Sequence, residues 1–150
     1  MRRITFSLAA VVALASVVTY MVPHLDMPTA WSTQGVPLRE TVTVVADEPI
    51  PNLPGKRLVS QIVDYRPGAN SAPHRHARSA FIYAYVLSGE VRSAVDDEPA
   101  RVYRAGESWF ESPGAHHRVS ANASDTESAR LLAVFIVDAA DEELTIPDSH

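Results

Sequence analysis

Three histidines in two distant segments are the residues whose types and spacing could do chemistry. His74 and His76 stand two positions apart, and His117 lies forty-one positions further on, in Pro113-Gly114-Ala115-His116-His117. Side chains at i and i+2 of an extended chain point to the same face, because successive side chains alternate. Neutral imidazoles are common ligands of divalent metal ions. The sequence therefore predicts a metal site made by His74, His76 and His117, on a scaffold that brings the two segments together.

The segments around these histidines are typical of an all-β protein. Short runs rich in β-branched and aromatic residues alternate with turn signals such as Pro67-Gly68, a pattern that indicates a sandwich or barrel. No helical period and no internal repeat is visible after residue 22. The expected strands cover residues 41–45, 57–66, 81–87, 91–95, 101–104, 108–111, 116–120 and 131–137.

The segment 81–87 is apolar on both sides of its expected strand. One side carries Phe81, Tyr83, Tyr85 and Leu87, and the other carries Ile82, Ala84 and Val86. This pattern is typical of a strand buried on both faces. We therefore expect the aromatic side to pack in the core or in the interface of a homodimer.

The composition limits the cofactors and partners. The chain has 150 residues, 46% of them apolar, which suits one domain with a packed core. Because there is no cysteine, any metal must be held by nitrogen and oxygen ligands. Imidazoles suit iron, zinc, nickel or copper, and manganese less well. The net charge of −5 and the lack of a basic stripe argue against nucleic acid as a partner.

The N-terminus resembles a bacterial export signal. Arg2 and Arg3 precede a run without a formal charge from Ile4 to Val22. We therefore expect residues 1–22 to be a signal peptide that directs the protein to the periplasm or the cell exterior. An uncleaved membrane anchor is the alternative, because the run is long enough to span a bilayer as a helix, and a misassigned start codon is the third. Residues 23–40 contain proline, threonine and serine without a period and are expected to be a linker.

Glycines bound the first histidine segment at a fixed spacing. Gly68 is followed by five residues and then by His74-Arg75-His76, and the segment closes at Gly89. This arrangement resembles a motif of the cupin family, the small barrels of the double-stranded β-helix (jelly-roll) type. Arg75, between the two histidines, is expected to point away from them.

The second histidine segment resembles the family's other motif. Gly106 precedes Pro113-Gly114, two residues and His117, and Asn122 stands one position later than the family's asparagine. His116 is expected to face away from its neighbour and not to ligate. The resemblance covers about residues 55 to 138 and implies a cupin barrel over residues 41–138, with an acidic tail at residues 139–150.

The resemblance is incomplete at one metal ligand. The position of the family's glutamate falls on Ile82, or on Phe81 if the register is one residue off, and neither side chain can ligate. The implied site is therefore reduced to three histidines, with open metal positions for water or substrate. Glu111 is a candidate substitute if it shares the inward face with Trp109, and is otherwise a solvent-facing or ion-paired carboxylate.

These observations leave the reaction open. Ile82, Ala84 and Val86 would form an apolar wall with little titratable machinery, and no catalytic triad, phosphate loop or carboxylate pair is visible. We expect a three-histidine metal-dependent oxygenase or isomerase that acts on a small organic molecule. The alternative is a non-catalytic module that binds or senses a small ligand, and a structural barrel with unused histidines is the third hypothesis.

Overall fold

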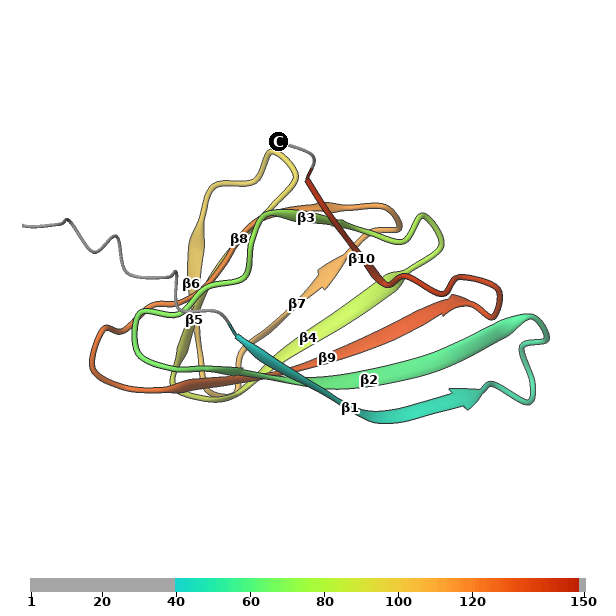
Figure 1. Cartoon of the computed structure of the whole chain (residues 1–150), viewed down its shortest axis with the longest axis horizontal. Coiled ribbons are helices and arrows are strands. Elements are labelled where there is room, and N and C mark those ends of the chain that lie inside the picture. The colour runs from blue at the N-terminus through green and yellow to red at the C-terminus, as the bar shows by residue number, and fades with distance from the viewer. Residues whose placement is uncertain (1–39, 149–150) are drawn as a thin grey trace, which may run out of the picture. The chain divides into compact units, whose positions relative to one another are not determined.

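Ten antiparallel strands form two five-stranded sheets in the computed structural model, which describes residues 40–148 (Figure 1). The strands are β1 (Thr41–Pro49), β2 (Lys56–Tyr65), β3 (His74–His76), β4 (Phe81–Ser88), β5 (Glu90–Val95), β6 (Arg101–Arg104), β7 (Ser108–Glu111), β8 (His116–Asn122), β9 (Ala129–Asp138) and β10 (Thr145–Pro147).

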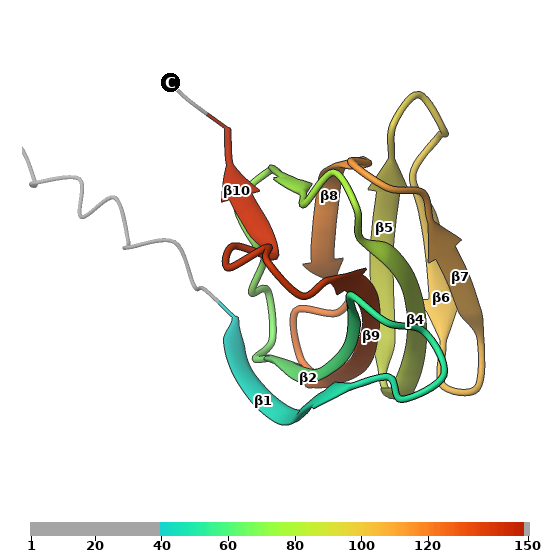
Figure 2. The same cartoon turned by 90° about the vertical axis from the view of Figure 1, so that its right-hand side faces the viewer.

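The two sheets curve around a common interior, as Figure 2 shows. One sheet has the strand order β1-β2-β9-β4-β7, and the other has the order β10-β3-β8-β5-β6. Neighbours such as β2 and β9 are far apart in sequence, so the barrel is assembled mainly from long-range pairings. The predicted all-β barrel is confirmed.

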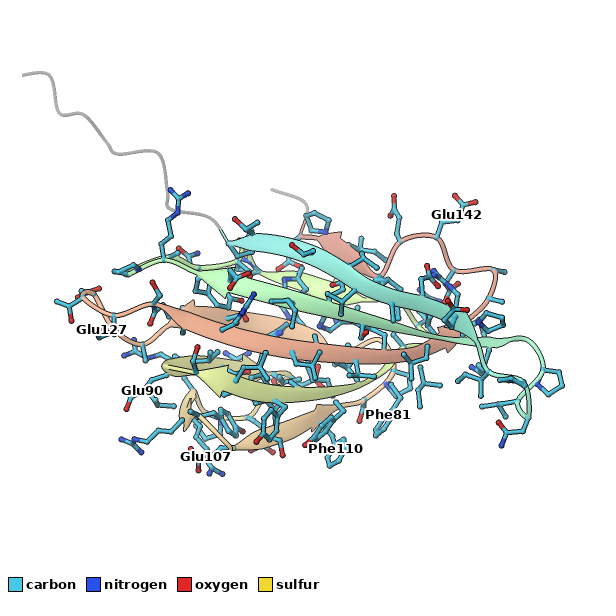
Figure 3. The ribbon with its side chains drawn as sticks, turned by 90° about the horizontal axis from the view of Figure 1, so that it is seen from below. Phe81, Glu90, Glu107, Phe110, Glu127 and Glu142 are labelled. Atoms are coloured by element: carbon cyan, nitrogen blue, oxygen red, sulfur yellow. The ribbon has the colours of Figure 1, made fainter. Side chains whose placement is uncertain are left out.

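Alternation along β4 places one set of side chains inside the barrel. Ile82, Ala84 and Val86 are at most 1% exposed. The expectation that the other face is also buried is wrong for the single chain, because Phe81 remains 42% exposed. Figure 3 shows Phe81 beside Phe110 on the outside of the sheet, where the two rings stack with centroids 5.5 Å apart.

The interior contains two apolar clusters that hold the sheets together. One is built around Tyr65, Val86, Val91 and Trp109, and the other around Val59, Ile82 and Phe135. Both clusters draw residues from β2, β4 and β9, so the sheet that faces the two histidine strands is rigidly packed.

The turn between β4 and β5 requires a glycine. Gly89 has a φ of +69°, a conformation that side chains disfavour, and a Cβ added there would lie 2.4 Å from the carbonyl oxygen of Ser128.

Asn122, the displaced asparagine of the second motif, holds the loop that follows β8 by hydrogen bonds. Its Nδ2 donates to the carbonyl oxygens of Arg66 and Glu127, at 3.0 and 2.7 Å.

Two segments are more ordered than the sequence pattern predicted. β1 continues to Pro49, beyond the expected end at residue 45. Within the expected acidic tail, Thr145–Pro147 forms β10 and pairs with β3. The expected signal or anchor and nearly all of the expected linker lie outside the described residues. Within residues 40–148, no helix is long and apolar enough to cross a membrane.

Candidate metal centre

The pairing of β3 with β8 brings the three predicted histidines together. His74 on β3 lies directly opposite His117 on β8, and His76 follows two residues later on the same face. The three side chains are buried, and each offers a ring nitrogen that lies within 4.8 Å of the other two. Two ligand atoms bound to one ion at about 2.1 Å lie at most about 4.2 Å apart. Small side-chain rotations would therefore bring all three nitrogens onto one ion.

Two sequence neighbours of these histidines, Arg75 and His116, point outward, as expected. Arg75 pairs with His116 across β3 and β8 in the alternate register, on the other face of the sheet. His116 Nε2 lies 2.8 Å from Asp148 Oδ2, so this ring is committed to a surface contact. His116 is therefore separate from the buried histidine cluster.

Backbone carbonyls fix the ring orientation of the first two histidines. Nδ1 of His74 lies 2.8 Å from the carbonyl oxygen of Ala72, and Nδ1 of His76 lies 3.3 Å from that of Leu144. Because a carbonyl oxygen only accepts, each Nδ1 carries the proton. Nε2 of each neutral ring is then left with a lone pair, the state that a metal ligand needs.

The third ring is fixed by a side chain. Nε2 of His117 lies 2.9 Å from Ser93 Oγ, and Nδ1 faces Glu111, 3.5 Å from Oε1. A hydroxyl can donate to a ring nitrogen or accept from it, so Ser93 holds the ring in either tautomer. In this orientation Nδ1 of His117 faces Glu111, the carboxylate that also lies beside His76.

Burial keeps two of the three histidines neutral. The pKa of His117 is lowered to about 4, chiefly because burial penalises the charged ring, although the nearby Glu111 opposes the shift. Burial also lowers the pKa of His74, against the opposing effect of its hydrogen bond to Ala72. At neutral pH both rings can therefore act as metal ligands without first losing a proton.

Glu111 enters the same cluster from β7. Its side chain and that of Trp109 both point inward, which meets the condition set by the sequence, and Glu111 is only 3% exposed. Oε1 accepts a hydrogen bond from Trp109 Nε1 at 2.9 Å. Burial raises the pKa of this carboxyl, but the His76 and His117 rings and the Trp109 N–H outweigh that effect, so the pKa of Glu111 lies below its usual range.

Several buried polar atoms lack a hydrogen-bond partner, and most of them gather at the histidine cluster. Among residues 40–148 the unpartnered buried side-chain atoms are Glu40 Oε2, Arg57 Nε, His76 Nε2 and Glu111 Oε2. All but the Arg57 atom belong to residues that line one cavity. His76 Nε2 and Glu111 Oε2 are 2.9 Å apart, but they are not aligned as a hydrogen bond. Because buried polar groups are normally satisfied, the lone pairs gathered here fit a bound cation.

The comparison with protein families agrees with this geometry. The cupin domain family matches residues 61–135, which is half of the chain. The matched residues begin within β2 and include all three histidines and Glu111. The chain belongs to the cupin family. No curated protein is detectably similar to it.

Solved structures share the cupin fold at low sequence identity. A protein with a double-stranded β-helix domain from Klebsiella pneumoniae is 18% identical, with a TM-score of 0.55, over 73% of this chain and 86% of that one. A cupin 2 conserved barrel protein from Salinispora arenicola is 23% identical, with a TM-score of 0.51, over 67% and 77%. A recombinant oxalate oxidase in complex with glycolate is 26% identical, with a TM-score of 0.51, over 71% of this cupin and 55% of the oxidase.

The cupin's histidine cluster opens into a cavity of about 160 Å³. One wall is apolar, as expected, and includes Ile82, Ala84, Leu131, Ala133 and Phe135. Val86, also expected there, belongs to the core cluster around Trp109 instead.

The other wall of the cavity is polar. The Tyr65 hydroxyl lies 2.9 Å from Ser71 Oγ and 2.7 Å from Ser120 Oγ. Two hydrogen bonds among three hydroxyls use two of their three hydrogens, so one O–H remains for a molecule in the cavity. Glu40 also lines the cavity, so the apolar wall expected from β4 is only one part of the lining, and a second carboxylate besides Glu111 belongs to it.

Sequence reasoning missed Glu40, Tyr65, Ser71, Ser93 and Ser120 as residues of this site. Alternation along β2 could have placed Tyr65 on the inward face. The partners of that hydroxyl come from other segments, and nothing in the sequence specifies which residues meet across the barrel. Glu40 falls at the end of the expected linker, where no pattern marked it.

Proposed function

We propose that this cupin binds one divalent metal ion with His74, His76 and His117 and uses it to act on a small organic molecule. The observation that carries the proposal is the convergence of three buried imidazoles beside a cavity with unpartnered polar atoms. A bound ion of this kind supplies Lewis-acid polarisation or activation of dioxygen. The protein supplies the orientation of the rings, a dry apolar wall and the polar wall that faces it.

The size of the cavity limits the substrate. A volume of about 160 Å³ corresponds to roughly five water molecules at their liquid volume, well below the range of drug-sized pockets. The oxalate oxidase bound to glycolate supports a substrate of similar size for this chain, because the two proteins share 26% identity. We therefore favour a small oxygenated molecule, which the bound ion would polarise and which the hydroxyl of Tyr65 would orient by a hydrogen bond.

The charge of the cavity makes the metal necessary for an anionic substrate. The carboxylates of Glu40 and Glu111 line the cavity, and no lysine or arginine does so among residues 40–148. A small organic acid would therefore meet only negative charge and neutral polar groups in the metal-free protein. Glycolate should bind measurably only after the protein has been loaded with metal, as titration calorimetry can show.

Titration of metal into single variants tests the proposal. We expect His74→Ala, His76→Ala and His117→Ala each to weaken binding of Zn²⁺ or Co²⁺ by at least about tenfold, because each removes one of three ligands. His116→Ala is the matched control, since it removes an adjacent imidazole that faces outward. Equal affinities in the wild type and all four variants would exclude the site.

A non-catalytic ligand-binding cupin remains the second candidate. The apolar wall and the absence of a motif glutamate favour it. Thermal stabilisation by a small organic acid, without oxygen consumption or product with any metal, would support this function over catalysis.

A further inference from the structure

We propose that Glu111 is the fourth protein ligand of the metal ion, an inference that rests on the proposed three-histidine site. The carboxylate enters from β7, whereas the sequence leaves only an isoleucine on β4 at the position where the resemblance implied a glutamate. Three observations carry this proposal: the register of β4 and β7, the unpartnered Oε2 of Glu111, and the lack of a lysine or arginine in the described lining of the cavity.

The register of β4 and β7 places Glu111 directly opposite Ile82. Paired residues of neighbouring antiparallel strands carry their side chains on the same face, with Cβ atoms about 4.5–5.5 Å apart. Ile82 lines the same cavity and is 1% exposed. A carboxylate at position 111 therefore reaches nearly the same volume as a carboxylate at position 82 would.

The two oxygens of Glu111 have different surroundings. Oε1 is held by Trp109 Nε1, which fixes the plane of the carboxylate. Oε2 has no hydrogen-bond partner and lies 2.9 Å from Nε2 of His76, which has none either. Because Nδ1 of His76 donates to Leu144, Nε2 of the neutral ring presents a lone pair. Two lone pairs at this distance repel each other, so either a proton on the ring or a metal ion bound by both atoms must lie between or beside them. We assign the metal ion, because the same two side chains also lie beside the other histidines of the cluster.

Within residues 40–148, no lysine or arginine side chain neutralises the Glu111 carboxylate. Among the described residues, the cavity around Glu111 is lined by no lysine or arginine, and its only ion-pair contacts are with His76 and His117. Buried carboxylates are normally paired with a cation or bound to a metal. The rival to our proposal is a carboxylate that only positions the two rings by accepting hydrogen bonds from them.

A crystal structure of the Zn²⁺-loaded wild type separates ligation from positioning. We expect an oxygen of Glu111 at about 2.0–2.2 Å from the ion, together with three histidine nitrogens. An ion held by the histidines with both Glu111 oxygens beyond about 3 Å would overturn this inference and leave the proposed function standing. If the histidines hold no ion, both proposals fail.

Moving the carboxylate across the strand pair provides a second test in solution. We expect Glu111→Ile to weaken Zn²⁺ binding by about ten- to a hundredfold. The double variant Ile82→Glu/Glu111→Ile should regain most of that loss, because the two positions face one volume. Glu107→Gln is the control, since this half-exposed carboxylate directly precedes β7, pairs with Arg101 and does not line the cavity.

Each result of the exchange has a defined meaning. Unchanged affinity in Glu111→Ile overturns the inference, and so does a double variant that binds no better than the single one. Thermal unfolding of each metal-free variant shows whether it is folded. If Glu111→Ile does not fold, Glu111→Gln replaces it under the same criterion, since the amide keeps the shape of the side chain and removes its charge.

Discussion

At the scale of the residue, the hydroxyl of Tyr65 links two segments at the polar wall of the cavity. It lies within hydrogen-bonding distance of Ser71, which precedes β3, and of Ser120 on β8. Burial raises the pKa of this phenol, so it stays protonated over the working pH range. Tyr65 is thus a neutral group that can orient an oxygen atom in the cavity.

We expect Tyr65→Phe to lower the free energy of unfolding by about 1–3 kcal/mol, because the buried hydroxyl of Ser120 and the half-buried hydroxyl of Ser71 lose a partner. Urea denaturation of the metal-free protein measures this change. Tyr83→Phe is the matched control, since Tyr83 belongs to the outer face of β4. Equal stability of the two variants would show that the hydroxyl network contributes nothing.

Single-residue roles were predictable only where they depend on local alternation. The inward direction of His74 and His76, and the outward direction of Arg75, follow from a period of two and are confirmed. The approach of Glu111 to His76 depends on how β7 pairs with β4 and how β3 faces them. Those relations are set by long-range packing, which no spacing in the sequence encodes.

At the scale of the element, the turns determine whether the strands keep their register. Gly89 joins β4, which carries Ile82, to β5, which pairs with β8. Its left-handed conformation and the 2.4 Å approach to Ser128 leave no room for a side chain.

We expect Gly89→Ala to be less stable than Gly55→Ala, in urea denaturation of both variants. Both glycines have a positive φ, so both variants pay the conformational cost of about 1–3 kcal/mol. A Cβ at position 55 has nothing within 4 Å, so the excess loss at position 89 reports the backbone clash alone. Equal losses would contradict the packing described for this turn.

The elements were largely predictable, and their exposure was not. The strands expected at 81–87 and 131–137 lie within β4 and β9, and the one expected at 57–66 matches β2 to within one residue at each end, because alternation and turn residues are local signals. The apolar pattern of β4 indicated burial on both faces, but its aromatic side is only partly covered in the single chain. The short β10 has no strong pattern of its own, and it forms by pairing with β3.

At the scale of the whole molecule, the exposed aromatic side of β4 and β7 is where we expect a second copy of the chain. Phe110 is 63% exposed and packs against Phe81 and Tyr83 along the free edge of the sheet. An apolar face beside an unpaired strand edge is suited to pairing with an identical edge. The homodimer itself stays a prediction.

Analytical ultracentrifugation tests this surface. We expect a dimeric wild type, and a Phe110→Glu variant that is monomeric at the same concentration, because two buried charges would meet at the interface. Leu53→Glu serves as the control, since Leu53 is an exposed apolar residue in the loop between β1 and β2. A wild type that is monomeric at all concentrations would remove the basis of the prediction.

The metal content of the folded protein tests the central claim most directly. Purified wild type is loaded with Zn²⁺, passed through a desalting column and analysed for metal and protein together. The account predicts about one ion per chain, and a content near zero in His117→Ala, because structural zinc sites need at least three protein ligands to hold the ion through such a step. A folded wild type that retains no zinc, cobalt, nickel, copper, iron or manganese would contradict it.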